Sequence, residues 1–128
     1  MKIILLISGG ALGTFLRYTV VEYGSRWNST SFPIGTLLVN LIGSFLIGFS
    51  WGLLGKEEVK PETKAFLFIG LFGGFTTFSS FALENFHLIR GGDFRTAITY
   101  LTISNVGGIL LVFAGYFFSQ SLLNYFRK

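Results

Sequence analysis

Polar and small side chains recur every four residues in an otherwise apolar stretch that begins near residue 33. They are Thr36, Asn40, Ser44, Gly48 and Gly52. This spacing puts them on one face of a helix. Small residues let two helices pack closely, but the carboxamide of Asn40 has donors and an acceptor that are costly to bury unpaired. Asn40 is therefore expected either to hydrogen-bond a neighbouring helix or to line a pathway.

The run GGFTTFSSF, from Gly73 to Phe81, combines poor helix formers with groups that could bind an ion. Two glycines followed by two threonines disfavour a helix, which predicts a local break. A break frees backbone carbonyls and amides, which are tolerated at membrane depth only where protein or a ligand satisfies them. Freed carbonyls suit a hard cation such as Na⁺, whereas the N-terminus of a half-helix suits an anion. The alternative is a kinked helix whose threonines bond their own backbone.

Phe78 and Phe81 lie three residues apart and therefore share a helix face. The edge of an aromatic ring is positive, so two rings could contact an anion without a permanent counter-charge. Simple packing is the alternative, because the chain has 16 phenylalanines. Glu84 follows on the face of Phe81, close to the end of the apolar stretch, where contact with solvent is expected.

Two further apolar stretches carry isolated polar groups. Tyr100 and Ser104 are four residues apart, with Asn105 beside them, and supply hydroxyl and amide donors. Arg17 interrupts the first stretch, on a face that it shares with two glycines. Its guanidinium either reaches the membrane surface or sits in a wet vestibule, where it would attract anions.

The inventory of polar groups favours an anion over a proton or a metal cation. Proton-coupled transport needs an ionisable group inside the membrane, and no central Asp, Glu or His interrupts the apolar stretches. The polar groups there are mostly hydrogen-bond donors, which can replace the hydration shell of a small anion stepwise. The chain has no cysteine and one histidine. We find no hydrolytic or redox constellation, which argues against an enzyme.

The elements that must position these residues are membrane-spanning helices. The 128-residue chain is 51% hydrophobic and 12% charged, with a mean hydropathy of +0.64. Four apolar stretches, at about residues 3–21, 33–54, 65–88 and 96–120, are long enough to cross a bilayer as helices. We therefore predict an all-α membrane protein with one four-helix transmembrane domain over residues 1–128 and a broken third helix. Short polar connections, including a solvated turn at 55–64, join the spans.

The distribution of Lys and Arg leaves the orientation open. Four spans put both termini on one side, and the positive-inside rule then needs a clear excess of cations on one face. The terminal side would hold Lys2, Lys56, Lys60, Lys64, Arg127 and Lys128. The other side would hold Arg26, Arg90 and Arg95, together with Arg17 if it reaches that interface. Either the termini are cytoplasmic, or the chain inserts in both orientations, which would permit an antiparallel dimer. Loop charges of this kind explain the net charge of +4 better than binding to nucleic acid does.

Three motifs together resemble the Fluc family of small fluoride channels, also called CrcB-type fluoride exporters. They are GALGTFLRY at 10–18, GTLLVNLIGSFLIG at 35–48 and GGFTTFSSF at 73–81. The resemblance spans the chain and implies a multi-pass protein of the cell inner membrane. It implies a dual-topology antiparallel homodimer in the lipid bilayer that exports fluoride passively and relieves its toxicity.

The resemblance also implies roles for individual residues. Asn40 would hydrogen-bond fluoride, and the ring edges of Phe78 and Phe81 would line its path. Backbone carbonyls of Gly73 and Thr76, from both subunits, would hold a central structural Na⁺. Polar positions along or near the path would be Thr36, Ser79, Ser80, Glu84, Tyr100 and Ser104, and Arg17 would match a basic residue near the end of the first helix.

Two departures and two alternatives accompany the resemblance. Ser80 stands where the family usually has threonine, which keeps the hydroxyl, and Gly108 stands where some relatives have serine, which shortens the row of hydroxyls. A small dual-topology multidrug exporter is the main alternative, but it should carry a glutamate in the middle of the first span. A membrane assembly subunit is another, but it would not need a polar stripe and a broken helix together.

Overall fold

A computed structural model describes residues 1–27, 30–54 and 59–126 of the chain. Within these ranges every regular element is helical. The elements, in order, are α1 (Lys2–Trp27), α2 (Ile34–Leu54), α3 (Pro61–Thr63), η1 (Lys64–Phe72), α4 (Gly73–Phe75), α5 (Phe78–Arg90), α6 (Phe94–Thr102), η2 (Ile103–Gly107) and α7 (Gly108–Phe126). η1 and η2 are wider, π-helical turns within longer helical stretches.

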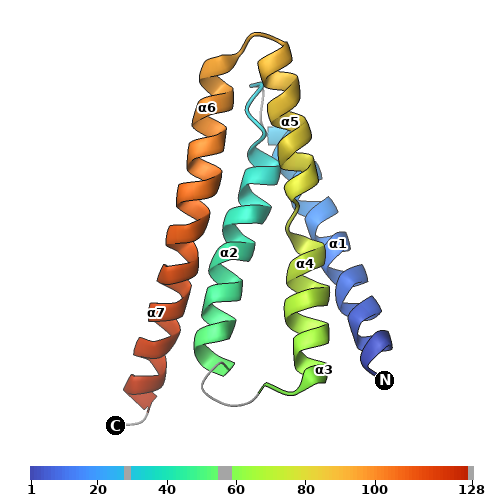
Figure 1. The fold of residues 1–128 in the computed structure, drawn as a ribbon, viewed down its shortest axis with the longest axis vertical. Coiled ribbons are helices and arrows are strands. Elements are labelled where there is room, and N and C mark those ends of the chain that lie inside the picture. The colour runs from blue at the N-terminus through green and yellow to red at the C-terminus, as the bar shows by residue number, and fades with distance from the viewer. Residues whose placement is uncertain (28–29, 55–58, 127–128) are drawn as a thin grey trace.

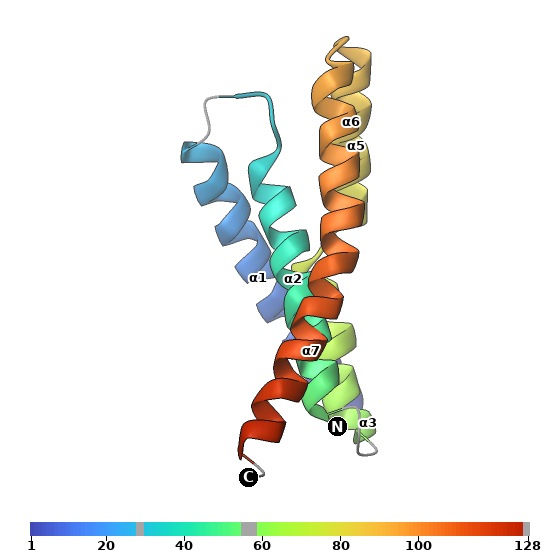
Figure 2. The same ribbon diagram turned by 90° about the vertical axis from the view of Figure 1, so that its left-hand side faces the viewer.

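The prediction of four spanning helical stretches is confirmed. Stretches long and apolar enough to cross a membrane are Lys2–Arg26, Ile34–Leu54, Pro61–Arg90 and Phe94–Phe126. Both ends of the chain lie at one end of the molecule, and the turn between α5 and α6 lies at the other (Figure 1). The α5–α6 hairpin leans away from α1 (Figure 2).

Three helical stretches extend beyond the predicted spans, and the fourth runs from Phe94 to Phe126 rather than from 96 to 120. α1 continues past residue 21 to Trp27, and an i, i+4 ion pair between Arg26 and Glu22 lies on its last turns. The turn predicted for 55–64 ends earlier, since Pro61 starts α3, and proline is well suited to the first helical position. Residues 55–58 of that turn lie outside the described part of the chain, as do Lys56, Arg127 and Lys128.

Glycines bring the backbones of two helix pairs into direct contact. A Cβ atom at Gly48 would clash with the carbonyl oxygen of Val112, so α2 and α7 touch backbone to backbone. A Cβ atom at Gly13 would clash with the carbonyl oxygen of Leu71, and α1 therefore packs equally closely on η1. Close contact of this kind is how helices associate where no water drives them together.

The α5–α6 hairpin packs on α2 through a small apolar cluster. Its buried members are Leu37, Phe81, Leu88, Ala97 and Tyr100. Gly92, with a φ of +82°, makes the tight turn, because this conformation is easy only for glycine. The Asp93 side chain then caps α6 by accepting a hydrogen bond from the Thr96 N–H.

Thr76 and Thr77 lie between α4 and α5 with extended backbone. Their φ, ψ angles are −84°, 159° and −150°, 121°. The Thr77 hydroxyl oxygen accepts a hydrogen bond from the Ser80 N–H and so caps α5. The extended backbone of these two residues separates α4 from α5 within the third stretch. Both residues line the cavity described next.

Candidate functional site

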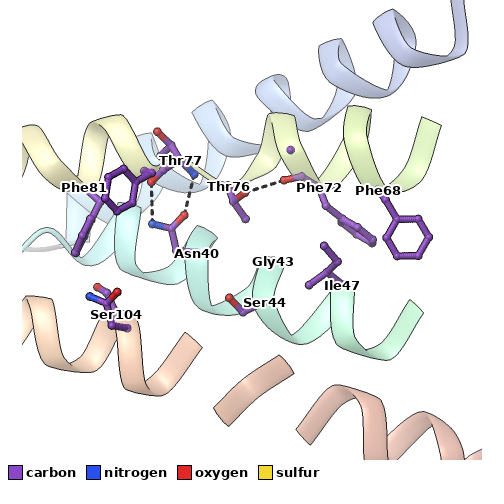
Figure 3. Close-up of a pocket in the computed structure, with 13 residues that line it drawn as sticks. Asn40, Gly43, Ser44, Ile47, Phe68, Phe72, Thr76, Thr77, Phe81 and Ser104 are labelled. Atoms are coloured by element: carbon purple, nitrogen blue, oxygen red, sulfur yellow. Dashed lines mark hydrogen bonds between the residues drawn. The ribbon is translucent and has the colours of Figure 1, made fainter. Parts of the chain in front are cut away.

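A cavity of about 380 Å³ opens beside the extended residues, between α2, the third stretch and the fourth (Figure 3). None of the described residues that line it carries a charge. Its lining includes the rings of Phe78 and Phe81 and six polar residues, Asn40, Ser44, Thr76, Thr77, Ser104 and Asn105. The polar stripe of the second stretch, the threonine pair and the hydroxyl row of the fourth stretch therefore meet at one place.

Asn40 holds Thr77 in its extended conformation. Its Nδ2 donates to the Thr77 carbonyl at 3.0 Å, and the Thr77 N–H donates to its Oδ1 at 2.8 Å (Figure 3). The carboxamide thus acts like a neighbouring strand and satisfies both backbone groups of one residue. Of the two alternatives for Asn40, the hydrogen bond to a neighbouring stretch is present, and the side chain also lines the cavity.

The same contacts take hydrogen-bond donors away from α4. In a continuous helix the Thr77 N–H would bond the Gly73 carbonyl, and the Ser80 N–H would bond the Thr76 carbonyl. Here the first N–H donates to Asn40 and the second to the Thr77 hydroxyl. The carbonyls of Gly73 and Thr76 are thereby left without their helical partners, and both residues line the cavity.

Phe78 and Phe81 touch, but they differ in burial. Their ring centroids are 5.6 Å apart. Phe81 is 6% exposed and meets the Tyr100 ring in a T-shaped contact at 5.0 Å, whereas Phe78 is 76% exposed. Phe81 is thus part of the core of the protomer, and Phe78 projects from it.

Ser104 is a buried donor without a partner. Its hydroxyl has no hydrogen bond to the described residues, although it is shielded from solvent and lines the cavity. A buried hydroxyl that is left unpaired is costly, so a partner at this point would be stabilising. The cavity therefore offers a free donor beside the rings of Phe78 and Phe81.

Glu84 joins three helices at the far side of Phe81. One carboxylate oxygen accepts a hydrogen bond from the Thr36 hydroxyl at 2.6 Å, and the other accepts one from the Tyr100 hydroxyl at 2.7 Å. Thr36 is 2% exposed and Tyr100 is fully buried. The expectation of a merely solvated Glu84 missed this cluster, because the partners lie far away in sequence. The signal for this cluster in the sequence was that Thr36 and Tyr100 each carry a hydroxyl group that can donate to a carboxylate.

Glu84 also lines two further spaces toward the α5–α6 end. One, of about 140 Å³, includes Thr36 and the start of α2. The other, of about 500 Å³, includes Ser31, His87 and Asp93. The polar groups thus form a row from the central cavity, past Phe81 and Glu84, to one end of the molecule.

Six predicted residues lie outside the central cavity, namely Thr36, Glu84 and Tyr100 of the cluster described above, together with Ser79, Ser80 and Arg17. Ser79 is exposed, and Ser80 instead contacts the Thr77 hydroxyl at 3.1 Å. Arg17 is half-buried on α1 and lines none of the cavities described here. Only some of the residues predicted for the site therefore line the central cavity.

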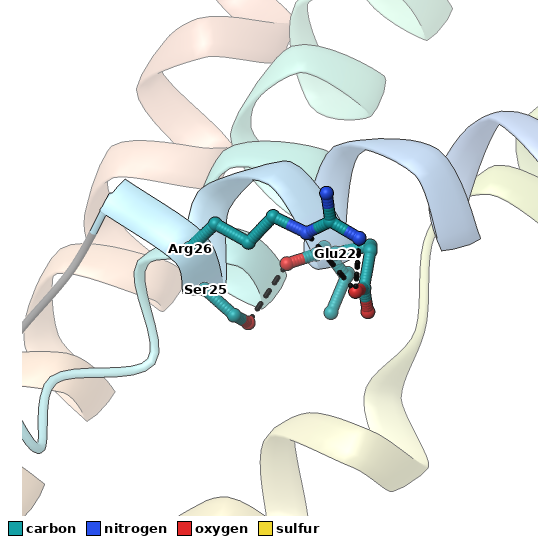
Figure 4. A network of polar contacts seen from close by, with 4 residues as sticks. Glu22, Ser25 and Arg26 are labelled. Carbon is teal, nitrogen blue, oxygen red and sulfur yellow. Dashed lines mark hydrogen bonds and ion pairs between the residues drawn. The ribbon is translucent and has the colours of Figure 1, made fainter.

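The end of α1 carries its own polar network. Arg26 and Glu22 form an exposed ion pair at 3.1 Å, and the Ser25 hydroxyl donates to the Val21 carbonyl (Figure 4). Exposed pairs of this kind contribute little to stability. They do cancel the charge at this end of α1.

Comparison with known proteins identifies close relatives along most of the chain. The family model described as CrcB-like protein, Camphor Resistance (CrcB), matches residues 4–116. A protein of Parabacteroides distasonis named fluoride-specific ion channel FluC is 46% identical over 96% of this chain and 96% of its own length. Proteins of the same name from Aquifex aeolicus and Thermus thermophilus are 43% and 41% identical, over 89% and 90% of this chain and 93% and 91% of their own lengths.

Proposed function

Because this chain belongs to the CrcB-like family, we propose that it is a fluoride-specific ion channel of a cell membrane. It is a multi-pass membrane protein. It lets fluoride leave the cell passively, down its electrochemical gradient, and so relieves fluoride toxicity. In a bacterial cell this membrane is the inner one.

The observation that carries this proposal is the central cavity. Its walls present a hydroxyl from Ser104, the rings of Phe78 and Phe81 and the amide of Asn40, and none of the described residues that line it is charged. Neutral donors can replace the water around a small anion without holding the anion too tightly. This chemistry suits fluoride conduction and gives no site for a transported proton or a large cationic drug.

The proposed path follows the row of polar groups described above. Fluoride passes between Phe78 and Phe81, contacts Asn40 and Ser104, and meets the cluster of Thr36, Glu84 and Tyr100 near the mouth. Thr76, Thr77 and Ser80 shape this path mainly through the backbone. Ser79 and Arg17 act outside the central cavity, where Arg17 attracts anions toward the protein.

The carbonyls of Gly73 and Thr76 are proposed to hold a structural Na⁺. Hard cations prefer oxygen ligands, and the two carbonyls have lost their helical donors. One chain supplies too few oxygens for such a cation, so a second copy provides the rest. A bound Na⁺ would neutralise these carbonyls and tie the two subunits together.

The second copy is proposed to run antiparallel to the first, with the third stretch broken at the point where the two chains meet. Phe78 is 76% exposed beside a polar cavity, although it lies in the middle of a span. An apolar space of about 690 Å³ shares Ile47 and Phe68 with the central cavity and continues toward the terminal end. A partner covering these surfaces would close the path against lipid.

The multidrug-exporter alternative gains no support from α1. Such an exporter needs a carboxylate in the middle of the first span. In α1 that region instead contains Gly9 and Gly13, which pack against the backbone of η1. We therefore do not propose drug export.

Ion efflux from liposomes tests the proposed function. Vesicles containing the purified protein are loaded with fluoride or chloride, the charge movement is balanced with a potassium ionophore, and release is recorded with ion-selective electrodes. Rapid fluoride release with negligible chloride release is the expected result. No fluoride release from a folded dimer of verified size would contradict the proposal.

A further inference from the structure

We propose that Ser44 of α2 supplies a further hydroxyl to the fluoride path, at a place that Gly108 of α7 leaves open for it. The inference rests on the proposed fluoride conduction and adds a contact that the path described above does not include. Ser44 lies one turn beyond Asn40 on α2 and lines the central cavity (Figure 3). Close packing of two helices is the alternative role for so small a residue.

The direct contact between the backbones of α2 and α7 ends at Ser44. At Gly48 a Cβ atom would clash with the Val112 carbonyl oxygen, so the backbones touch there. Four residues earlier on both helices, a Cβ atom at Gly108 would lie 3.3 Å from the Ser44 hydroxyl oxygen. Outside its own helix it would meet no other described atom within 4 Å. The Ser44 hydroxyl therefore stands where a side chain at position 108 would point.

The second and fourth helical stretches present their polar groups to the cavity in matching steps. The two stretches run in the same direction (Figure 1). Ser44 follows Asn40 by four residues, and Gly108 follows Ser104 by four. Because Ser44 meets Gly108, the same step places Asn40 level with Ser104, and these two residues line the cavity together with Ser44. Ser44 thus provides a hydroxyl at the level where the fourth stretch has only a glycine.

The Ser44 hydroxyl is free to donate to an anion. A serine or threonine inside a helix often bonds a carbonyl of its own preceding turn, as Thr99 and Thr102 do at 2.8 Å each. Ser44 instead has no hydrogen bond to any residue that the structure describes, and the same holds for the Ser104 hydroxyl. Ser44 is half-buried and lines a cavity without charged residues among those described, so a small anion there could exchange water for its hydroxyl.

Glycine at position 108 allows the Ser44 hydroxyl to keep this place. A separation of 3.3 Å is tighter than most contacts of a real Cβ atom. A side chain at position 108 would therefore push the Ser44 hydroxyl aside or occupy its space. The two positions share one site for a hydroxyl, which either helix could supply but not both in the same place. This sharing distinguishes a donor in the path from a residue that only packs.

Fluoride efflux from liposomes tests this inference by moving the hydroxyl from one helix to the other. Ser44→Ala should lower the efflux rate roughly two- to tenfold, because it removes one donor. Gly108→Ser added to Ser44→Ala should restore most of the native rate, since the new hydroxyl enters the vacated space. Gly108→Ala added to Ser44→Ala fills that space with a methyl group and should leave the rate low. Ser50→Ala, half-buried on α2 but outside the cavities described here, is the matched control and should keep the native rate.

The outcomes separate this inference from the proposed function. Native efflux from Ser44→Ala would overturn the role of Ser44 and leave the channel standing. Equal efflux from the two double variants would overturn the shared site, because recovery in both would mean that position 44 supplies only packing. Thermal unfolding in detergent shows that each variant is folded, and a fall in efflux that merely follows a lower unfolding midpoint would also overturn the role. A native protein that releases no fluoride would instead contradict the proposed function.

Discussion

At the scale of single residues, Asn40 links the chemistry of the cavity to the shape of the backbone. Its amide satisfies both backbone groups of Thr77. One Nδ2 hydrogen remains beyond the bond to the Thr77 carbonyl, since a carboxamide has two. The same side chain can therefore hold the extended segment and still offer a donor to an anion.

Asn40→Asp removes the hydrogen-bond donors of Asn40 while the side chain keeps its size. The substitution keeps an oxygen for the Thr77 N–H, but it sets a second oxygen against the Thr77 carbonyl and puts a negative charge in the anion path. We expect fluoride efflux to fall at least about tenfold, as the loss of a buried hydrogen bond costs about 1–3 kcal/mol. Asn124→Asp, at an exposed position of α7, is the control. Fluoride efflux at the native rate from the Asn40→Asp variant would contradict a role for Asn40 in conduction.

Ser104→Ala should reduce conduction without destabilising the fold. The Ser104 hydroxyl has no protein partner among the described residues, so its removal breaks no hydrogen bond of the protomer. We expect fluoride efflux to fall roughly two- to tenfold, in line with a hydrogen bond of about 0.5–1.5 kcal/mol. The thermal unfolding midpoint should remain unchanged. Ser121→Ala, exposed on α7, controls for loss of a hydroxyl, and a lower midpoint for Ser104→Ala alone would point to a structural role.

At the scale of the elements, the junction between α4 and α5 depends on a few local contacts. Thr77 caps α5 with its hydroxyl, and Asn40 supports its backbone from α2. The two contacts fix the start of the helix that carries Phe81 and Glu84. The geometry of the path thus follows from the end of one helix and the start of another.

Thr77→Val should lower stability, whereas Thr77→Ser should preserve it. Valine has nearly the same shape as threonine but cannot accept the Ser80 N–H, and loss of an N-cap costs about 1 kcal/mol. Serine retains the acceptor. Thermal unfolding of the purified protein in detergent measures the difference. Equal stability of the two variants would mean that the cap contributes nothing.

The elements could be predicted from the sequence much better than their contacts. Four apolar stretches and the glycine–threonine run are local signals. Hydropathy and helix propensity predict the helices and the junction directly from them. The partner of Asn40 is 37 residues away and the hydroxyl donors of Glu84 come from two other helices. Such pairs depend on how helices pack, which no local pattern encodes. The free hydroxyl of Ser104 likewise becomes visible only when its surroundings are known.

At the scale of the whole molecule, the protomer consists of two tightly packed helix pairs and a projecting hairpin. Glycine contacts join α2 to α7, and α1 to η1. The central cavity lies between these pairs rather than inside either one. The width of the cavity therefore depends on contacts that lie far from it.

Gly48→Ala should destabilise the protein, whereas Gly10→Ala should not. A methyl group at Gly48 meets the Val112 carbonyl and forces α2 and α7 apart, at a cost of about 1–3 kcal/mol. A methyl group at Gly10 meets no atom within 4 Å. Alanine at that position should even stabilise α1 by up to about 1 kcal/mol, because it is the better helix former. Unfolding in detergent and the elution volume of the purified protein measure both variants, and equal behaviour would contradict the close packing of α2 on α7.

The junction at Thr76 and Thr77 has a consequence for the response to transmembrane voltage. The carbonyl end of α4 and the amide end of α5 meet there as fixed dipoles, and the adjacent cavity is lined by uncharged residues throughout the described part of the chain. Voltage-dependent gating requires charges that move through the field, at about 2.3 kcal/mol per elementary charge for each 100 mV. Dipoles anchored in the backbone supply no such movement. The open probability of the channel should therefore not change with the sign or size of the voltage, which single-channel recording in symmetric solutions would measure.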